Sequence, residues 1–254
     1  MIVNPMPEAT AILIPARLRS VRLPNKPLVE IGGAPMIVQV WRRACAAEVG
    51  PVIVACAEPE IAAAIEAHGG TAVLTDPELP SGTDRIFQAL GRIDPERRFV
   101  RVINLQGDLP TLDPMAIRTV LEPLERLGTD IGTLAVATED PAEKADPNLV
   151  KAIIAFDAAR PRLGRALYFT RATAPSGDGP VHHHIGIYAF RREVLERFAT
   201  LPPSPLERRE RLEQLRALEA GMTIGVALVD TNPLGVDTPE DLARARREID
   251  ARAV

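Results

Sequence analysis

The chain has 254 residues, a formal net charge of −4, and 46% apolar and 25% charged residues. This length allows one large domain with a buried core, and the composition is that of an ordinary globular protein. A net charge this close to zero creates no broad positive electrostatic field that would attract DNA or RNA, so we expect no nucleic-acid partner. The two cysteines, Cys45 and Cys56, are too few for a disulfide scaffold and lack metal-ligand spacing.

The first residues, MIVNPMPEAT, do not contain a basic segment followed by an apolar one, so we expect no signal peptide. No apolar run approaches the roughly 18 to 20 residues that a membrane-spanning helix requires. We therefore expect a cytoplasmic protein with no membrane partner. The sequence has no internal repeat and no obvious linker, which favours one compact unit over residues 1–254.

The first half alternates short apolar runs with stretches of helical spacing. Strands are expected at Ala11–Ile14, Val52–Ala55, Thr71–Leu74 and Val100–Ile103. Residues 37–44 and 61–68 place apolar side chains, with His68 at the end of the second stretch, on one helical face. This order predicts a mainly parallel, doubly wound sheet, whose ligands bind beyond the carboxyl ends of the strands.

The second half is less regular, and it indicates a smaller inserted sheet within an α/β domain. Strands are expected at Ile131–Ala137, Leu149–Ile154, Arg165–Phe169, Ile185–Phe190 and Ile224–Val229, with the third and fourth antiparallel. Residues 206–218 predict one helix with Leu212, Leu215 and Leu218 facing inward. Thr238-Pro239-Glu240-Asp241 is a capping pattern that predicts a final helix.

Four cations lie within ten residues directly after the first predicted strand, in the segment Pro15–Pro27. Arginine offers forked contacts and lysine a point charge, so a loop of this kind can wrap a triphosphate. The segment has neither the Gly-Lys-Ser/Thr of a Walker loop nor the three-glycine dinucleotide pattern. A solvated basic loop is the competing interpretation.

Two short motifs place an aspartate after a strand or before a helix. In Gln106-Gly107-Asp108, the glycine allows close approach of a ligand and the aspartate can hold a hard divalent cation, although the segment is also typical of a turn. Asp237 precedes the final helix, where it could act as an outer cap or pair with Asp108 on magnesium.

Two further motifs have a structural and a functional interpretation. Ser81-Gly82-Thr83-Asp84-Arg85 is typical of a helix N-terminus, which can also recognise polar ligand edges. The cluster His182-His183-His184 invites a metal site, but adjacent strand residues point to opposite faces. One inward histidine, His184, is therefore the more economical interpretation.

Taken together, seven segments resemble the CMP-Kdo synthetases, the cytidylyltransferases of 3-deoxy-manno-octulosonate (Kdo), along nearly the whole chain. The nucleotide loop of that family has the form PAR-x-x-S-x-R-LP-x-KPL, and its later motifs are SGTDR, N-x-QGD-x-P, ALYFSRAT, HIGIY, SPLE…LEQLR and VDTPEDL. The matching segments are Pro15–Leu28, Ser81–Arg85, Asn104–Pro110, Ala166–Thr173, His184–Tyr188, Ser204–Arg216 and Val236–Leu242. Each match alone is weak, but seven in the right order are specific.

The resemblance implies a nucleotide-diphospho-sugar transferase fold, a Rossmann-like mixed sheet with helices on both faces and a small inserted antiparallel sheet, and a homodimer. It divides the chain into a nucleotide part (about 9–128), a sugar-binding and dimerisation part (about 129–230) and a C-terminal strand and helix (231–254). The implied catalytic residues are Arg17, Lys26, Asp108 and Asp237, the last two holding Mg²⁺. The implied nucleotide-binding residues are Pro15, Ala16, Arg17, Arg22, Lys26, Ser81, Asp84 and Gln106, with Arg85 supporting their loop. The implied sugar-binding residues are Gln106, Arg171, His184, Tyr188, Glu213 and Gln214, with Glu213 and Gln214 lying off the buried leucine face.

By the same resemblance, the anomeric hydroxyl of the sugar attacks the α-phosphorus of CTP and pyrophosphate leaves, in a step that serves lipopolysaccharide synthesis. The sugar carries its own carboxylate, so the repulsion between two anions must be cancelled, by Mg²⁺ on the aspartate pair and by Arg17 and Lys26. No residue stands out as a general base.

The sequence departs from the family pattern at three places. Leu79 and Pro80 stand where the family has His and Gln, residues 174–180 form a glycine-rich segment without arginine, and Ala55-Cys56-Ala57-Glu58 replaces an ATDD-like turn. A modified sugar acid, such as 8-amino-Kdo or a nonulosonate, would account for the changes on the sugar side. A nucleotidyltransferase with another nucleotide or acceptor, and a non-catalytic nucleotide-binding relative, are the two remaining interpretations of the sequence.

Overall fold

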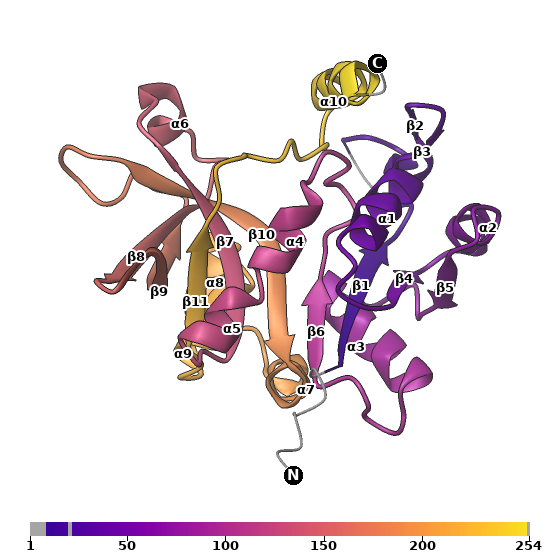
Figure 1. Ribbon diagram of the computed structural model, residues 1–254, viewed down its shortest axis with the longest axis horizontal. Helices are drawn as coiled ribbons and strands as arrows, with labels where there is room; N and C mark the ends of the chain where they lie inside the picture. Colours follow the sequence, from indigo (N-terminus) through magenta and orange to yellow (C-terminus); the bar gives the residue numbers. More distant parts are fainter. Residues whose placement is uncertain (1–8, 20–21, 253–254) are drawn as a thin grey trace, which may run out of the picture. The chain divides into compact units, whose positions relative to one another are not determined.

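The computed structural model describes residues 9–19 and 22–252 (Figure 1). The chain divides into two compact units: unit 1 contains the chain up to Ile117 and again from Pro233, and unit 2 runs from Arg118 to Asn232. The helix α4 (Pro114–Thr119) spans the first boundary. In the part of the chain that the structure describes, no helix is long and apolar enough to cross a bilayer.

Unit 1 is built on four parallel strands in the order β5-β4-β1-β6. Their bounds are Thr10–Ala16 for β1, Val52–Cys56 for β4, Thr71–Leu74 for β5 and Arg101–Asn104 for β6. Every residue of β1 is buried, which explains why its sequence is apolar at consecutive positions rather than alternating. All four predicted strands are confirmed to within two residues at either end.

Helices α1 (Met36–Ala46), α2 (Pro59–Glu66) and α3 (Gly82–Ile93) pack against these strands. The two helical stretches predicted between the strands are confirmed, except that His68 lies beyond the end of α2 and is exposed. After β1, the described residues 22–35 contain a 3₁₀ turn at Lys26–Leu28 and the two-stranded antiparallel hairpin of β2 (Glu30–Ile31) and β3 (Ala34–Pro35).

The final helix α10 (Pro239–Arg252) begins where the capping pattern predicted. Thr238 Oγ1 accepts a hydrogen bond from the backbone N–H of Asp241 at 3.1 Å, and the Asp241 carboxylate accepts from the Thr238 hydroxyl and N–H. This reciprocal cap satisfies backbone donors that the first helical turn leaves without partners.

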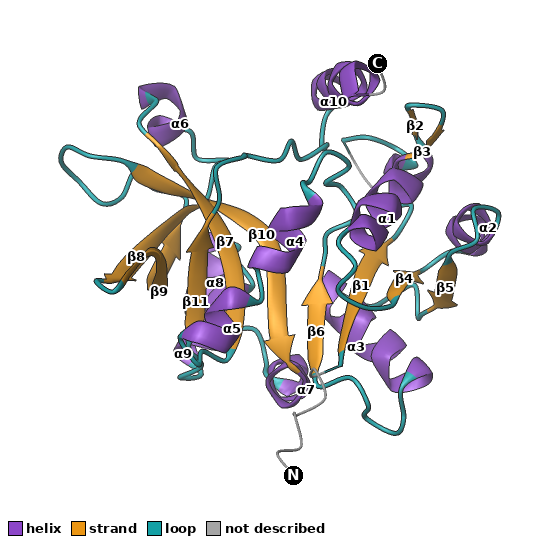
Figure 2. Ribbon diagram, in the orientation of Figure 1, coloured by secondary structure: helices purple, strands orange, loops and turns teal. Residues whose placement is uncertain are grey.

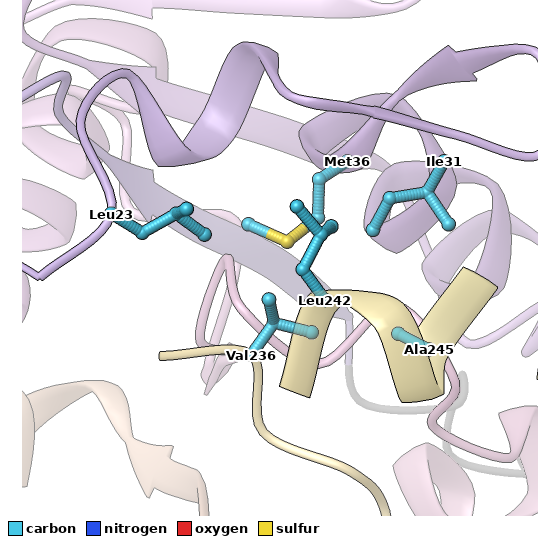
Figure 3. Close-up of a cluster of buried hydrophobic side chains, with 6 residues drawn as sticks. All are labelled: Leu23, Ile31, Met36, Val236, Leu242 and Ala245. Carbon is cyan, nitrogen blue, oxygen red and sulfur yellow. The ribbon is translucent and has the colours of Figure 1, made fainter. Parts of the chain in front are cut away.

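An apolar cluster joins the two chain segments of unit 1 (Figure 3). Leu23, Ile31 and Met36 come from the first segment, and Val236, Leu242 and Ala245 come from the second; none is more than 8% exposed. The backbone N–H of Val236 also donates to the carbonyl of Asp108 at 2.9 Å. Packing and hydrogen bonding thus hold the C-terminal segment beside the segment that follows β6.

Unit 2 contains five strands in the order β10-β7-β11-β9-β8 (Figure 2). Their bounds are Ile131–Thr138 for β7, Lys151–Asp157 for β8, Arg160–Thr170 for β9, Val181–Arg191 for β10 and Ile224–Leu228 for β11. β11 pairs with β7 in parallel and the other pairs are antiparallel, so the sheet is mixed. β10 also meets β8 where His183 pairs with Lys151, so the sheet curls back on itself.

The helices of unit 2 are short, and one expectation about them is wrong. They are α5 (Glu122–Arg126), α6 (Pro141–Ala145), α7 (Arg192–Thr200), α8 (Pro205–Glu210) and α9 (Gln214–Glu219). Residues 206–218 do not form one helix, because Arg211 adopts a left-handed conformation (φ 58°) that ends α8. Leu212 and Leu215 are buried as predicted, whereas Leu218 is only partly buried.

The predicted strands of unit 2 are confirmed in position, but one pairing is wrong. β9 and β10 do not pair with each other: β9 lies between β8 and β11, and β10 pairs with β7 and β8. Each strand is 11 residues long, so the apolar runs Arg165–Phe169 and Ile185–Phe190 covered only part of each strand.

Candidate functional site

A cavity of about 270 Å³ opens at the carboxyl edge of the unit 1 strands. It is lined by Pro15, Ala16, Arg17, Arg19, Lys26, Pro27, Ser81, Gly82, Arg85, Gln106, Gly107 and Asp108. The lining includes all the predicted nucleotide-binding residues except Arg22 and Asp84. Because β1, β4 and β6 are parallel, their carboxyl ends meet at one edge, where doubly wound sheets bind ligands.

The cationic loop after β1 is held through its backbone as well as its side chains. The N–H of Leu18 donates to a carboxylate oxygen of Glu58, which follows β4, at 3.0 Å. A Cβ on Gly107 would lie 3.0 Å from the carbonyl oxygen of Pro15, so only glycine allows the two segments to come this close without displacement. These contacts therefore hold the first residues of the loop in place. Residues 20–21 of the loop lie outside the described part of the chain.

Lys26 bridges the two aspartates that the sequence singled out. Its Nζ donates to Asp108 Oδ2 and to Asp237 Oδ1, each at 2.9 Å. Burial of the Lys26 side chain opposes its charge, but the attraction of Asp108 and the hydrogen bonds to both carboxylates outweigh burial and raise its pKa above the ordinary value. The amine is therefore held as an ammonium ion between two carboxylates.

Asp237 has a second cationic partner, since Arg22 Nη2 lies 3.0 Å from its Oδ2 atom. Partial burial alone would raise the pKa of Asp237, but its hydrogen bond to Lys26 and the two positive charges lower it. The sequence also allowed Asp237 to act as an outer cap of the final helix. In the structure Asp241 caps this end instead, since its carboxylate accepts hydrogen bonds from the backbone N–H groups of Asp237 and Thr238.

The two carboxylates suit a magnesium ion whose remaining coordination positions are filled by other ligands. They already converge on one cation, and carboxylate oxygens are the ligands that Mg²⁺ prefers. Within residues 9–19 and 22–252, no group of three or more His, Cys, Asp or Glu side chains could hold a metal by itself. This donor set suits Mg²⁺, which commonly takes one or two carboxylates together with substrate phosphates and waters.

The N-terminus of α3 forms one wall of the cavity. Ser81 caps the helix, because its Oγ accepts from the N–H of Asp84 at 3.1 Å and donates to the Asp84 carboxylate at 2.8 Å. Arg85 is only 2% exposed and donates to the Thr75 hydroxyl and to the carbonyl oxygens of Asp76 and Pro77. Arg85 thus ties the 75–77 loop to α3.

The predicted sugar-binding residues other than Gln106 all lie in unit 2. His184 and Tyr188 are four residues apart on β10, a spacing that spans about 13 Å in a regular strand. Their ring centroids are instead 5.5 Å apart, because a β-bulge inserts Gly186 and Ile187 opposite β7. The bulge therefore brings the two rings together.

Thr133 of β7 organises this bulge. Its Oγ1 lies 2.9 Å from His184 Nε2, 2.8 Å from the carbonyl of Ile187 and 3.3 Å from the carbonyl of Ile185.

Burial lowers the pKa of His184 to about 3, so the ring is neutral at pH 7. Burial, with the nearby Glu213 carboxylate, raises the pKa of Tyr188, so its phenol remains un-ionised.

Arg171 follows β9 and is held by the end of α8. The Glu210 carboxylate accepts from the Arg171 N–H at 3.1 Å and from the Thr170 hydroxyl at 2.9 Å, and the Glu210 carbonyl accepts from Arg171 Nε at 3.1 Å. Arg171 Nη1 donates to the carbonyl of Pro147 at 3.3 Å. Glu210 therefore fixes both the backbone and the guanidinium of Arg171.

The expectation that Glu213 and Gln214 both lie off the buried face is wrong for Gln214. Its exposed fraction is 7%, whereas Glu213 is partly buried. The difference arises because Gln214 begins the separate helix α9, which turns a new face inward. Of the three consecutive histidines, His184 is the buried one, and His182 and His183 are partly buried.

Comparisons with known proteins identify the family of this chain. The sequence model of the family described as "Cytidylyltransferase" matches residues 11–224. A protein of Parvibaculum lavamentivorans named 3-deoxy-manno-octulosonate cytidylyltransferase is 62% identical, over 96% of this chain and 93% of its own length. A protein of the same name from Rhodospirillum centenum is 60% identical, over 97% and 95%. The chain belongs to the cytidylyltransferase family.

A solved structure supports the same assignment and confirms the fold. The structure of a CMP:2-keto-3-deoxy-manno-octonic acid synthetase complexed with CTP superposes with a TM-score of 0.88. It is 37% identical and covers 96% of this cytidylyltransferase and 99% of its own chain. The α/β fold implied by the sequence motifs, with a mixed sheet, helices and a small antiparallel sheet, is thereby confirmed.

Several residues that shape this cytidylyltransferase's candidate sites carry little signal in the sequence. Asn104 is 1% exposed; it accepts from Gln106 Nε2 at 3.1 Å and donates to the Thr83 hydroxyl at 3.4 Å, so it links the 106–108 segment to α3. Asn104 was noted in the sequence only as the first residue of the segment Asn104–Pro110, and its role as a link was not predicted. Thr133, Glu58 and Glu210 gave no comparable signal, because their partners lie at least 39 residues away in the chain.

Proposed function

We propose that this chain catalyses transfer of the cytidylyl group from CTP to the anomeric hydroxyl of Kdo, giving CMP-Kdo and pyrophosphate for lipopolysaccharide synthesis. The chain is a nucleotidyltransferase of the cytidylyltransferase family. The observation that carries the choice of substrates is its high identity, along almost its whole length, with proteins named for this reaction. In the reaction, the anomeric oxygen bonds to the α-phosphorus while the bond to the pyrophosphate oxygen breaks.

The unit 1 cavity has the charge that a nucleoside triphosphate requires. Arg17 and Lys26 line it, Arg22 lies on the same loop, and the N-terminus of α3 presents backbone N–H groups at its wall. We assign the triphosphate to these groups, since guanidinium and ammonium donors together bind and orient phosphates. Ser81, Asp84 and Gln106 would contact the nucleotide beside them.

Magnesium is part of the proposal. Asp108 and Asp237 would hold the ion, which would offset the phosphate charge and polarise the oxygens bound to it. The support is the convergence of both carboxylates on one cationic centre. Arg17 and Lys26 would add charge stabilisation as pyrophosphate leaves.

In unit 2 we assign Kdo contacts to Arg171, His184, Tyr188, Glu213 and Gln214. Arg171 supplies a guanidinium suited to a sugar carboxylate, and a neutral His184 with an un-ionised Tyr188 can exchange hydrogen bonds with hydroxyl groups. Glu213 adds a carboxylate acceptor and Gln214 an amide. Gln106 lies in unit 1, and its sugar contact stays a prediction from the sequence.

A homodimer and a cytoplasmic location, where CTP is supplied, also remain our proposals.

The glycine-rich segment 174–180 was the reason to consider a modified sugar acid. Lys144 Nζ donates to the carbonyl of Gly179 at 2.7 Å, and the Thr173 hydroxyl donates to the Lys144 carbonyl at 3.0 Å. The segment is therefore tied to α6 through main-chain oxygens, and these contacts favour neither sugar over the other.

Pyrophosphate release from purified protein with CTP and Mg²⁺ tests the proposal, with Kdo, 8-amino-Kdo and a sialic acid compared in parallel. We expect pyrophosphate release with Kdo. Its rate should fall at least about 10²-fold in Asp108→Asn, a variant that keeps the size of the side chain. Release with another sugar alone would reassign the acceptor. No release with any sugar, despite measurable CTP binding, would favour a non-catalytic nucleotide-binding role.

A further inference from the structure

The ammonium group of Lys26 lies at the point where Asp108 and Asp237 converge. Its two contacts are both 2.9 Å, and the Lys26 side chain is only 17% exposed. It is also fixed from the backbone side, because Lys26 opens a 3₁₀ turn whose next residue, Pro27, is buried. The two carboxylates come from distant parts of the chain, and this one cation joins them.

A divalent ion that binds both carboxylates would need the same space. Lys26 Nζ is already bonded at 2.9 Å to Asp108 Oδ2 and to Asp237 Oδ1, the carboxylates that would hold Mg²⁺, so an ion held by both would compete with the ammonium for the same oxygens. Two cations in contact repel each other strongly in a partly buried site. The ammonium and the metal therefore exclude each other at this position.

We propose that Lys26 is an exchangeable counter-ion, which bridges the two aspartates in the substrate-free protein and yields its place to the divalent metal when the triphosphate binds. The proposal rests on the proposed function, because the triphosphate is the anion that receives the displaced ammonium. Lys26 lines the cavity beside Arg17 and Arg19, so that anion would lie within reach of its flexible side chain.

The exchange makes metal and nucleotide binding cooperative. Without nucleotide, the metal must displace an ammonium that is bonded to both aspartates, so we expect the metal alone to bind weakly. Once the triphosphate accepts the ammonium, both carboxylates become available. By thermodynamic linkage, the metal must then strengthen nucleotide binding by the same factor.

Titration of the substrate-free protein with Mn²⁺ alone, followed by the electron paramagnetic resonance signal of free Mn²⁺, tests the exchange. Mn²⁺ prefers the same oxygen ligands as Mg²⁺. We expect Lys26→Met to bind Mn²⁺ about tenfold more tightly than wild type, or more, within the usual range of coupling. Lys26→Arg, which keeps the charge, should stay within about threefold of wild type.

Arg19→Met is the matched control, because it removes a cation that lines the same cavity, whereas the cations bonded to the aspartate pair are Lys26 and Arg22. Its Mn²⁺ affinity should change by less than about threefold. Equal or weaker Mn²⁺ binding by Lys26→Met than by wild type would overturn the proposal. If Lys26→Met does not fold, as judged by circular dichroism, Lys26→Gln carries the same expectation.

Failure of the proposed function would be recognised separately, since this titration contains neither CTP nor sugar. A second titration, of CTP without metal, tests whether the Lys26 ammonium binds the triphosphate. Lys26→Met should bind CTP at least about fivefold more weakly, because it lacks the ammonium that the phosphates receive. Unchanged CTP affinity in Lys26→Met would contradict the exchange.

Discussion

The hydroxyl of Thr133 lies 2.9 Å from Nε2 of His184, although the two residues are 51 positions apart. The same hydroxyl lies 2.8 Å from the carbonyl of Ile187, inside the bulge of β10. A hydroxyl that donates to this carbonyl can accept from the histidine, which places the ring proton on Nε2. Thr133 thereby sets both the shape of the bulge and the tautomer of His184.

Replacing Thr133 by valine tests this relationship. The change keeps the side-chain shape but leaves a buried imidazole N–H and a carbonyl without their partner, so we expect a loss of about 1 to 3 kcal/mol in the free energy of unfolding. Urea denaturation measures it. Thr133→Ser retains the hydroxyl and should lose less than half as much. In kinetics, Thr133→Val should raise the KM for the sugar and leave the KM for CTP within about twofold, as a positioning role predicts.

The buried His184 should make stability depend on pH. Its pKa is about 3 in the folded protein, against an ordinary value of 6.5, so between these values the unfolded chain holds a proton that the folded chain does not. This contribution to stability is complete above pH 6.5 and is lost progressively as the pH falls towards 3. Burial also lowers the pKa values of His182 and His183, which act in the same direction.

His184→Gln should therefore flatten the dependence of unfolding free energy on pH. Between about pH 5.5 and 4 the slope should fall by about 1.4 kcal/mol per pH unit, the value for one proton. Urea denaturation at several pH values measures the slope. His68→Gln, which changes an exposed histidine, is the control and should leave the slope nearly unchanged. An unaltered slope in His184→Gln would show that the ring is not buried in its neutral form.

Arg85 supports the loop before α3 through three acceptors, and it is only 2% exposed. Burial lowers the pKa of the guanidinium, which nevertheless remains charged at neutral pH. Arg85→Met should cost about 2 to 4 kcal/mol of stability, because charged hydrogen bonds are lost and buried acceptors remain. Arg92→Met, on the same helix but less buried, should cost less than about 1 kcal/mol. Equal losses in the two variants would argue against the supporting role.

Glu210 holds Arg171 through its carboxylate and its carbonyl. Glu210→Gln keeps the backbone contact and the size of the side chain, but it weakens the acceptor of the Arg171 N–H and the Thr170 hydroxyl. We expect the KM for the sugar to rise about three- to tenfold, with CTP binding unchanged, in steady-state kinetics. Glu219→Gln, a change to an exposed carboxylate on α9, is the matched control. Equal effects on both substrates would indicate general unfolding rather than a local role.

The sequence predicts well those features that depend on neighbours in the chain. Apolar runs located β1, β4 and β6, and because parallel strands end at one edge, the polar residues after them could be placed around one cavity. Lys26 and Asp108 were found in this way. The pairing of Asp108 with Asp237 also followed as one of two options, although only packing across the chain ends decides it.

Features that depend on distant partners could not be predicted. Thr133 in an apolar strand looks like any β-forming residue, and the bulge of β10 exists only in the register with β7. Gln214 was placed on the wrong face because the left-handed conformation of Arg211 breaks the helix, and arginine rarely adopts that conformation. These failures lie in unit 2, where the proposed sugar contacts depend most on long-range pairing.

The ³¹P nuclear magnetic resonance spectrum of a reaction with CTP, Kdo and Mg²⁺ tests the central claim most directly. We expect the three CTP signals to be replaced by one phosphodiester signal and one pyrophosphate signal in equal molar amounts. Removal of Mg²⁺ by a chelator, or the change Asp237→Asn, should suppress the conversion. Persistence of the CTP signals with Kdo in the intact, folded protein, or cleavage of CTP that yields no phosphodiester, would contradict the assignment.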